Sequence, residues 1–106
     1  MSVFEVRCGG EIRAEHDRVA GMRVITRDAL ADFWQHNQEL ANRHGVYVFA
    51  LQRRGPGAPL PFYVGKTEKG RGFKQETFNP RNRRAYNAAL LVGHGTPLLY
   101  FILPKA

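Results

Sequence analysis

The chain has 106 residues, the length of about one domain, and at this size roughly two thirds of the unfolded surface can be buried. Its formal net charge is +7, and a single cysteine, Cys8, excludes an internal disulfide and a CxxC-type thiolate metal site. This cysteine usage predicts a cytoplasmic location, and the absence of any apolar run near about 20 residues excludes a membrane-spanning helix.

The positive charge is concentrated in one third of the chain. Residues 1–51 carry six Arg and seven Asp or Glu, a net charge of −1. Residues 52–86 carry nine Lys or Arg and only two acidic residues, Glu68 and Glu76, a net charge of +7. Charge concentrated in this way favours a polyanionic partner such as nucleic acid over a basic face that is merely solvated.

The N-terminal part, residues 1–43, predicts two strands and a helix. Residues 2–7 and 22–25 are rich in Val, Ile and Phe and are bounded by Gly, which predicts two short strands, either a hairpin or an extension. Thr26 can cap a helix with Asp28 in its first turn, and this helix is expected to run until Gly45. Its apolar face is formed by Leu30, Phe33, Trp34, Leu40 and Ala41.

The segment that follows predicts a β-hairpin. Residues 46–52 and 60–64 are β-prone, and they flank the Gly/Pro cluster RRGPGAP, which is typical of an enlarged hairpin loop. Arg53 and Arg54 lie at the tip of this loop. No linker or repeat divides the chain, so residues 1–106 are expected to form a single domain.

The C-terminal part predicts two helices and a strand. Residues 71–78 are expected to form a short helical segment. Asn79 followed by Pro80 is an N-cap with a first-position proline, and it predicts a helix through Val92 that Gly93 or Gly95 ends. Residues 98–103 are an apolar run, typical of a last strand.

Two tyrosines on the predicted hairpin form a candidate site. Side chains alternate along a strand, so Tyr47 shares a face with Phe49, and Tyr63 shares one with Gly65. With an even register both tyrosines project from the same face, and Gly65 leaves space beside them. A phenol has a pKa of about 10, and a nearby ammonium can lower it by roughly 1 to 3 units, which favours a base. The alternative is a pair of half-buried strand aromatics.

The motifs Gly45-Val46-Tyr47 and Tyr63-Val64-Gly65-Lys66 resemble the signature of the GIY-YIG nuclease superfamily. That family has a small domain with a three-stranded antiparallel sheet and flanking helices, and it cuts phosphodiester bonds using a divalent metal. The resemblance covers residues 45–103. It implies an α+β fold with a three-stranded antiparallel sheet flanked by helices over residues 44–106, preceded by an N-terminal strand and helix extension.

The resemblance also implies roles for individual residues. Tyr47 becomes the general base or water-orienting phenol, Tyr63 orders water and phosphate, and Lys66 assists the catalytic tyrosine. The family's phosphate-holding arginine falls near Lys74, with Arg71 as the other candidate. Lysine would supply the charge of this group without its bidentate fork.

The family's cofactor is a divalent cation, so Mg2+ or Mn2+ is implied, held by a glutamate on a helix after the third strand. This sequence has no acidic residue after Glu76. Three explanations are open: the catalytic helix lies beyond the given sequence, the domain binds without cutting, or Glu76 or Glu68 has taken the role. Phe78 occupies a position where many members have His or Tyr, and Tyr86 is a possible substitute.

The predicted function is therefore an endonuclease domain acting on nucleic acid, DNA in preference to RNA. A binding module without catalytic activity is the alternative, and a protein-interaction domain that uses the tyrosine face is a third hypothesis. In the first two cases the basic residues of the loop and helices contact phosphates. These residues are Arg53, Arg54, Lys69, Arg81, Arg83 and Arg84.

Overall fold

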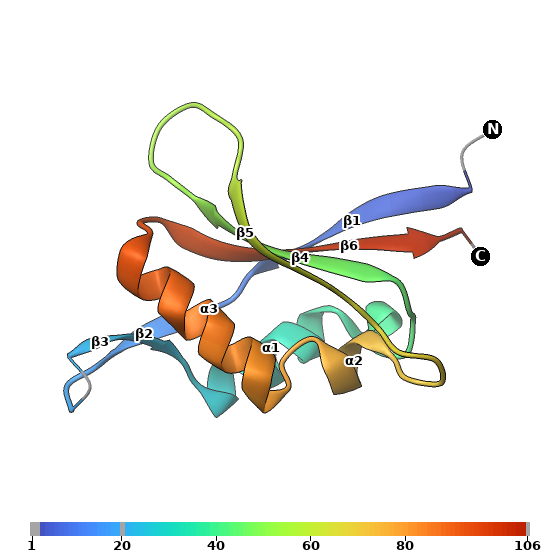
Figure 1. The fold of residues 1–106 in the computed structure, drawn as a ribbon, viewed down its shortest axis with the longest axis horizontal. Helices are drawn as coiled ribbons and strands as arrows, with labels where there is room; N and C mark the ends of the chain where they lie inside the picture. Colours follow the sequence, from blue (N-terminus) through green and yellow to red (C-terminus); the bar gives the residue numbers. More distant parts are fainter. Residues whose placement is uncertain (1–2, 20, 106) are drawn as a thin grey trace.

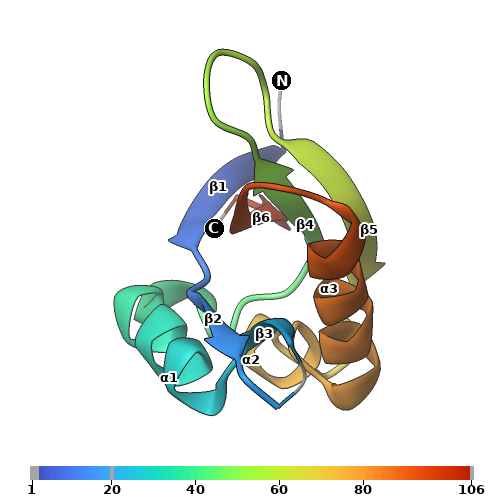
Figure 2. The same cartoon turned by 90° about the vertical axis from the view of Figure 1, so that its left-hand side faces the viewer.

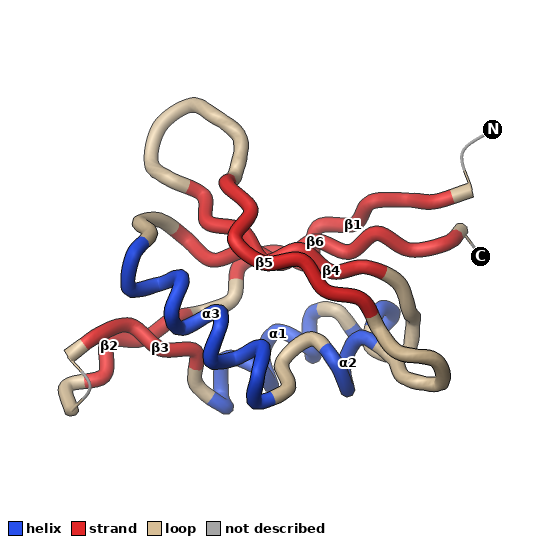
Figure 3. The backbone as a smooth tube through the Cα atoms, in the orientation of Figure 1, coloured by secondary structure: helices blue, strands red, loops and turns tan. Residues whose placement is uncertain are grey.

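The computed structural model describes residues 3–19 and 21–105, which form an α+β fold with two antiparallel sheets (Figures 1 and 3). The elements follow in the order β1 (Phe4–Glu11), β2 (Ala14–Asp17), β3 (Met22–Ile25), α1 (Arg27–His36), a 3-10 turn (Gln38–Leu40), β4 (Val46–Gln52), β5 (Leu60–Lys66), α2 (Phe73–Glu76), α3 (Pro80–Val92) and β6 (Thr96–Pro104). The larger sheet has the strand order β1-β6-β4-β5, and β2 pairs with β3 in the smaller sheet.

The larger sheet has four strands, so the three-stranded sheet predicted from the sequence is wrong. The fourth strand is β1, which pairs with β6 from Phe4 opposite Pro104 to Glu11 opposite Leu98. The first strand is thus an edge of the main sheet. It does not form a hairpin with β3, because β3 pairs with β2 instead.

Gly9 and Gly10 explain why β1 continues to Glu11, beyond the strand predicted for residues 2–7. They resemble a strand boundary, but they mark an irregularity in the pairing with β6 between Cys8 and Gly10. A Cβ at Gly9 would lie 2.7 Å from Cζ of Phe33 and 2.8 Å from Cε2 of Phe101. Glycine is therefore needed here because two core rings pack directly against the strand.

The predicted hairpin is confirmed, with β4 and β5 joined by a loop that rises away from the helices (Figure 2). The β4–β5 pairing shifts between Phe49 and Ala50. Just before β4, Gly45 has a φ of +150°, a conformation that favours glycine. A Cβ at Gly45 would also collide with the carbonyl oxygen of Ile102.

Helix α1 begins as predicted but ends earlier than expected. The Thr26 hydroxyl accepts a hydrogen bond of 3.2 Å from the backbone N–H of Ala29, as an N-cap does. The helix ends at His36 and not at Gly45 because Asn37 leaves the helical conformation. The Asn37 amide donates to the carbonyl oxygens of Gly9 and Phe33, at 2.8 Å and 2.9 Å, which ties the helix end to β1.

The three helices cover one face of the larger sheet, and the core lies between these two layers (Figures 1 and 2). Alternate residues of β6 point into this core, with Leu99, Phe101 and Leu103 fully buried. The opposite face of the sheet exposes apolar side chains, including Val6 at 67% and Val64 at 62%. None of the described helices is long and apolar enough to cross a membrane.

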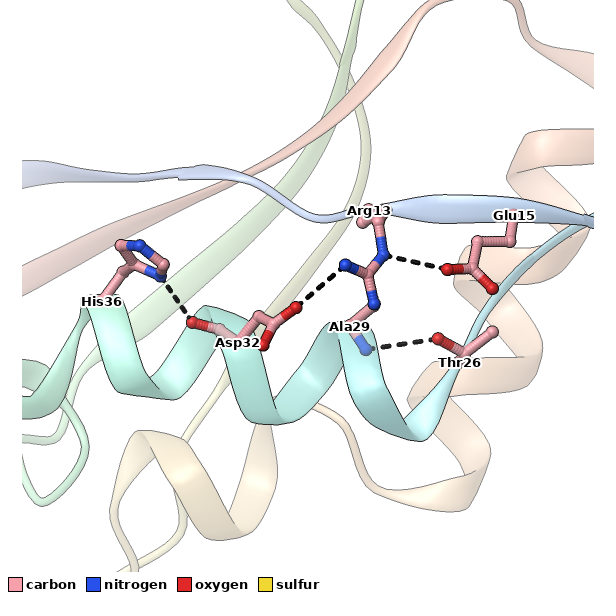
Figure 4. A network of polar contacts seen from close by, with 6 residues as sticks. All are labelled: Arg13, Glu15, Thr26, Ala29, Asp32 and His36. Carbon is pink, nitrogen blue, oxygen red and sulfur yellow. Dashed lines mark hydrogen bonds and ion pairs between the residues drawn. The ribbon is translucent and has the colours of Figure 1, made fainter.

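A polar network joins the segment after β1 to α1 (Figure 4). The Arg13 guanidinium contacts the carboxylates of Glu15 at 3.0 Å and Asp32 at 2.9 Å. His36 Nδ1 lies 2.8 Å from the carbonyl oxygen of Asp32. Arg13, Glu15 and Asp32 thus pair their charges with one another, on the side of the molecule occupied by α1.

Candidate functional site

The two hairpin tyrosines project from the same face of the sheet, as predicted. Tyr63 pairs with Phe49, and Tyr47 pairs with Gly65, so these four residues lie on one side of the hairpin. This side faces the helices. The tyrosine face is therefore part of the interior layer and does not form an exposed hydrophobic patch.

Gly65 provides the space that Tyr47 occupies. A Cβ at Gly65 would lie 2.5 Å from Cζ and 2.6 Å from the hydroxyl oxygen of Tyr47, well inside normal contact distances. The outer end of the Tyr47 ring, with its hydroxyl, therefore lies directly against the backbone of β5 at Gly65. This is the physical reason for the glycine of the second motif.

Asn82, in the first turn of α3, connects the two tyrosines. Its Nδ2 donates to the Tyr47 hydroxyl at 2.7 Å, and its Oδ1 accepts from the Tyr63 hydroxyl at 2.6 Å. The same Nδ2 lies 2.9 Å and 3.3 Å from the carbonyl oxygens of Glu76 and Thr77. Because Asn82 is fully buried and satisfied on all sides, it holds both phenols in one arrangement.

Asn82 is not among the site residues predicted from the sequence, although the sequence contains a signal for it. Asn82 lies one helical turn before Tyr86, and Ala89 and Leu90 continue the same buried face of α3. An amide in an apolar stripe needs hydrogen-bond partners when it is buried. An asparagine on the otherwise apolar face of α3 therefore indicates a buried hydrogen-bond network between this helix and the hairpin.

A pocket of about 500 Å3 opens beside the phenols, and we call it the tyrosine pocket. It is formed by the end of β5, the loop after it and the start of α3. Its lining residues are Tyr47, Tyr63, Val64, Gly65, Lys66, Thr67, Glu68, Lys69 and Arg81. Three cations and one carboxylate, that of the exposed Glu68, thus surround the two phenols.

The environment of Tyr47 favours its neutral form. Burial raises the pKa of the Tyr47 phenol above its ordinary value of 10.0, and the charges of nearby Tyr63 and Glu76 act in the same direction. The hydrogen bond from Asn82 and the charge of Arg81 offset only part of this rise in pKa. The charge of Arg81 thus lowers the Tyr47 pKa, as expected for a nearby cation, but burial outweighs it, so the predicted net lowering of the phenol pKa is wrong.

The two candidates for the phosphate-holding cation lie in different places. Lys74 lines a separate hollow against α1, together with Leu30 and Trp34. Arg71 lines a pocket that adjoins the tyrosine pocket, and its Nε lies 3.8 Å from Oε1 of Glu76. Of the two, the structure brings only Arg71 close to the predicted site.

The other basic residues lie in three places: at the start of α3, beyond its far end, and in its contact with β3. Arg81 and Lys69 line the tyrosine pocket, and Arg84 is exposed three residues after Arg81. Arg53 and Arg54 line a different pocket, at the far end of the helix. Arg83 is half-buried and its Nη2 donates to the carbonyl oxygen of Ile25 at 3.3 Å, so its guanidinium is part of the contact between α3 and β3.

Phe78 and Tyr86 both belong to the core. The Phe78 ring makes edge contacts with Phe33 and Trp34, which explains an apolar residue at this position. The Tyr86 ring stacks on Phe49, and its hydroxyl donates to the carbonyl oxygen of Thr77 at 2.8 Å. Tyr86 is fully buried, so it does not replace a proton-transfer residue at the pocket.

The carboxylates around the tyrosine pocket do not make up a complete site for Mg2+ or Mn2+. Glu76 lies close enough to Tyr47 to raise the phenol pKa, and its side chain is only 10% exposed, but its charge faces Arg71. Over residues 3–19 and 21–105, no three His, Cys, Asp or Glu side chains are grouped to share a metal ion. The use of a divalent metal stays a prediction of the family resemblance.

Comparisons with known proteins give no match: no family model fits the chain, and neither curated proteins nor solved structures resemble it significantly.

Proposed function

We propose that this chain is a nucleic-acid-binding domain of the GIY-YIG type, in which the tyrosine pocket holds a backbone phosphate. The observation that carries this proposal is the grouping of Lys66, Lys69 and Arg81 around the two phenols. Contacts of this kind position a nucleic acid without reading its sequence. The family resemblance favours DNA over RNA, and such a partner agrees with the cytoplasmic location predicted from the single cysteine.

The phenols would contact the phosphate as neutral groups. The Tyr47 oxygen accepts a hydrogen bond from Asn82, so its own proton is free to be donated to a phosphate oxygen. The Tyr63 hydroxyl donates its proton to Asn82, so toward the pocket its oxygen can act only as a hydrogen-bond acceptor. Because burial raises the pKa of Tyr47, this donor remains protonated throughout the physiological range.

Binding is tested by titrating fluorescent duplex DNA of about 16 base pairs with the chain at several salt concentrations. Replacing Lys66 and Arg81 by glutamine removes two phosphate contacts, so the slope of log K against log salt should fall by about 2. The double variant Arg27→Gln/Lys105→Gln removes the same charge from exposed residues outside the pocket and should change the slope little. Equal decreases of the salt slope in the two double variants would contradict a phosphate site at the tyrosines.

Hydrolysis of the bound phosphodiester is a second candidate function. The specific observation in its favour is that the motif tyrosines Tyr47 and Tyr63 are held by one buried amide beside a pocket lined by cations. Of the two roles that the resemblance implies for Tyr47, orienting a water is the one that suits a neutral phenol, because burial raises the pKa of Tyr47.

Hydrolysis is tested by incubating the chain with supercoiled plasmid and either Mg2+ or Mn2+. Nicking that is abolished by Tyr47→Phe, with DNA affinity lowered only about fivefold by the loss of one hydrogen bond to the phosphate, is the expected result for a nuclease. Nicking at the parental rate by Tyr47→Phe would exclude a catalytic role for this phenol. DNA binding without nicking in the presence of either metal would contradict the nuclease function and support only the binding function.

A further inference from the structure

A second basic pocket lies at the opposite end of α3 from the tyrosine pocket. It has a volume of about 540 Å3 and is formed by β3, the end of β4 and the turn between α3 and β6. We call it the arginine pocket, and its lining residues are Arg23, Gln52, Arg53, Arg54, His94, Gly95 and Thr96. Its lining has three arginines and no acidic residue.

The arginine pocket has one anchored cation and two exposed ones. Arg23 is half-buried, and its Nη1 donates to the carbonyl oxygen of Gly95 at 2.8 Å, which fixes the guanidinium beside the turn. Arg53 and Arg54 are exposed. Within the described part of the chain none of these three arginines forms an ion pair. Their charge is therefore available to an anionic ligand.

We propose that the arginine pocket binds another phosphate of the same nucleic acid whose backbone the tyrosine pocket holds. This inference rests on the proposed function and adds a second point of contact to it. Arg53 and Arg54 are phosphate contacts predicted from the sequence, whereas Arg23 and His94 reach the same pocket only through the fold.

The length of α3 gives the spacing between the two contacts. Arg81, in its first turn, lines the tyrosine pocket, and His94, just beyond its end, lines the arginine pocket. The helix has 13 residues, so the pockets are separated by about 20 Å. A duplex rises by about 3.4 Å per base pair, so the separation corresponds to about six base pairs along the duplex axis.

The surface of α3 between the pockets also favours a phosphate backbone. Arg84 follows Arg81 by three residues, so both lie on the same side of the helix, and both are exposed. One turn further on, the exposed residue is the small Ala88. A backbone that leaves the tyrosine pocket along α3 therefore meets a further cation and no acidic side chain of this helix before it reaches the arginine pocket.

Two points of contact make the affinity depend on ligand length. A dinucleotide has a single internucleotide phosphate and cannot occupy both pockets at once, whereas a duplex of about 16 base pairs reaches both. The double variant Arg53→Gln/Arg54→Gln should therefore weaken binding of the duplex and lower its salt slope by about 2, with little effect on the dinucleotide, whose phosphate the tyrosine pocket holds. Both positions are exposed, so folding should be unaffected.

The experiment measures fluorescence anisotropy of both ligands with four proteins: the parent, Arg53→Gln/Arg54→Gln, Lys66→Gln/Arg81→Gln and the control Arg27→Gln/Lys105→Gln. The tyrosine-pocket variant should weaken both ligands, and its failure to do so would overturn the proposed function. If that variant behaves as expected but Arg53→Gln/Arg54→Gln matches the control on the duplex, the second contact alone is overturned. Equal weakening of the short and the long ligand by Arg53→Gln/Arg54→Gln would also overturn it.

Discussion

At the scale of single residues, Asn82 determines the geometry of the candidate site. It donates to Tyr47 and accepts from Tyr63, and so sets which phenol offers a proton to the pocket and which offers an acceptor. An asparagine amide can do this because it carries a donor and an acceptor on one rigid group. Neither tyrosine has another hydrogen-bonded side-chain partner among the described residues.

We expect Asn82→Leu to destabilise the fold and weaken DNA binding together. Leucine is of similar size but leaves two phenols and the carbonyl oxygens of Glu76 and Thr77 without their buried partner, at a cost of about 2–4 kcal/mol. Tyr63→Phe removes only one of these bonds and should cost about 1 kcal/mol. Urea denaturation measures both free energies of unfolding, and similar small losses in the two variants would contradict the bridging role of Asn82.

At the scale of elements, the sequence predicts the segments whose signals are local. The Gly/Pro cluster between two β-prone runs predicts the β4–β5 hairpin, and Asn79 with Pro80 predicts the start of α3, where the Asn79 side chain accepts from the backbone N–H of Asn82 at 2.8 Å. The end of α1 and the extent of β1 depend on contacts between distant residues. Asn37 bonds to Gly9 across 28 positions, and no local pattern contains that information.

The candidate site likewise contains residues that local sequence signals predict and residues whose placement depends on the packing of distant elements. The motifs identify Tyr47, Tyr63 and Gly65 because alternation along two paired strands places them on one face. Placement of the helical cations depends on which side of each helix faces the sheet. Lys74 turns toward α1, and Arg83 turns toward β3, so these two do not join the tyrosine pocket, although their spacing in the sequence is equally suggestive.

At the scale of the whole molecule, the one-sided arrangement of helices and sheet accounts for both the core and the buried tyrosine rings. Tyr47 and Tyr86 lie in the layer between the sheet and the helices, and both are almost fully buried. Burial raises the pKa of each phenol because the charged form loses its hydration. Both tyrosines therefore link the stability of the fold to alkaline pH.

The free energy of unfolding should fall as the pH rises above about 10, the ordinary pKa of tyrosine. Above that pH the unfolded chain releases the protons of Tyr47 and Tyr86, while the folded chain retains them because their pKa values are raised. The unfolded state then binds fewer protons, so each tyrosine lowers the stability by up to about 1.4 kcal/mol per pH unit until its folded pKa is reached. Below about pH 9 neither form ionises and this contribution is constant.

Tyr86→Phe isolates one of these contributions. The variant loses the hydrogen bond to Thr77, at a cost of about 1 kcal/mol at neutral pH, but it has no phenol to ionise at this position. Its stability should therefore decline less steeply than that of the parent between about pH 10 and pH 11, so the two curves converge. Urea denaturation at several pH values measures this, and parallel declines would show that Tyr86 does not keep its proton in the folded chain.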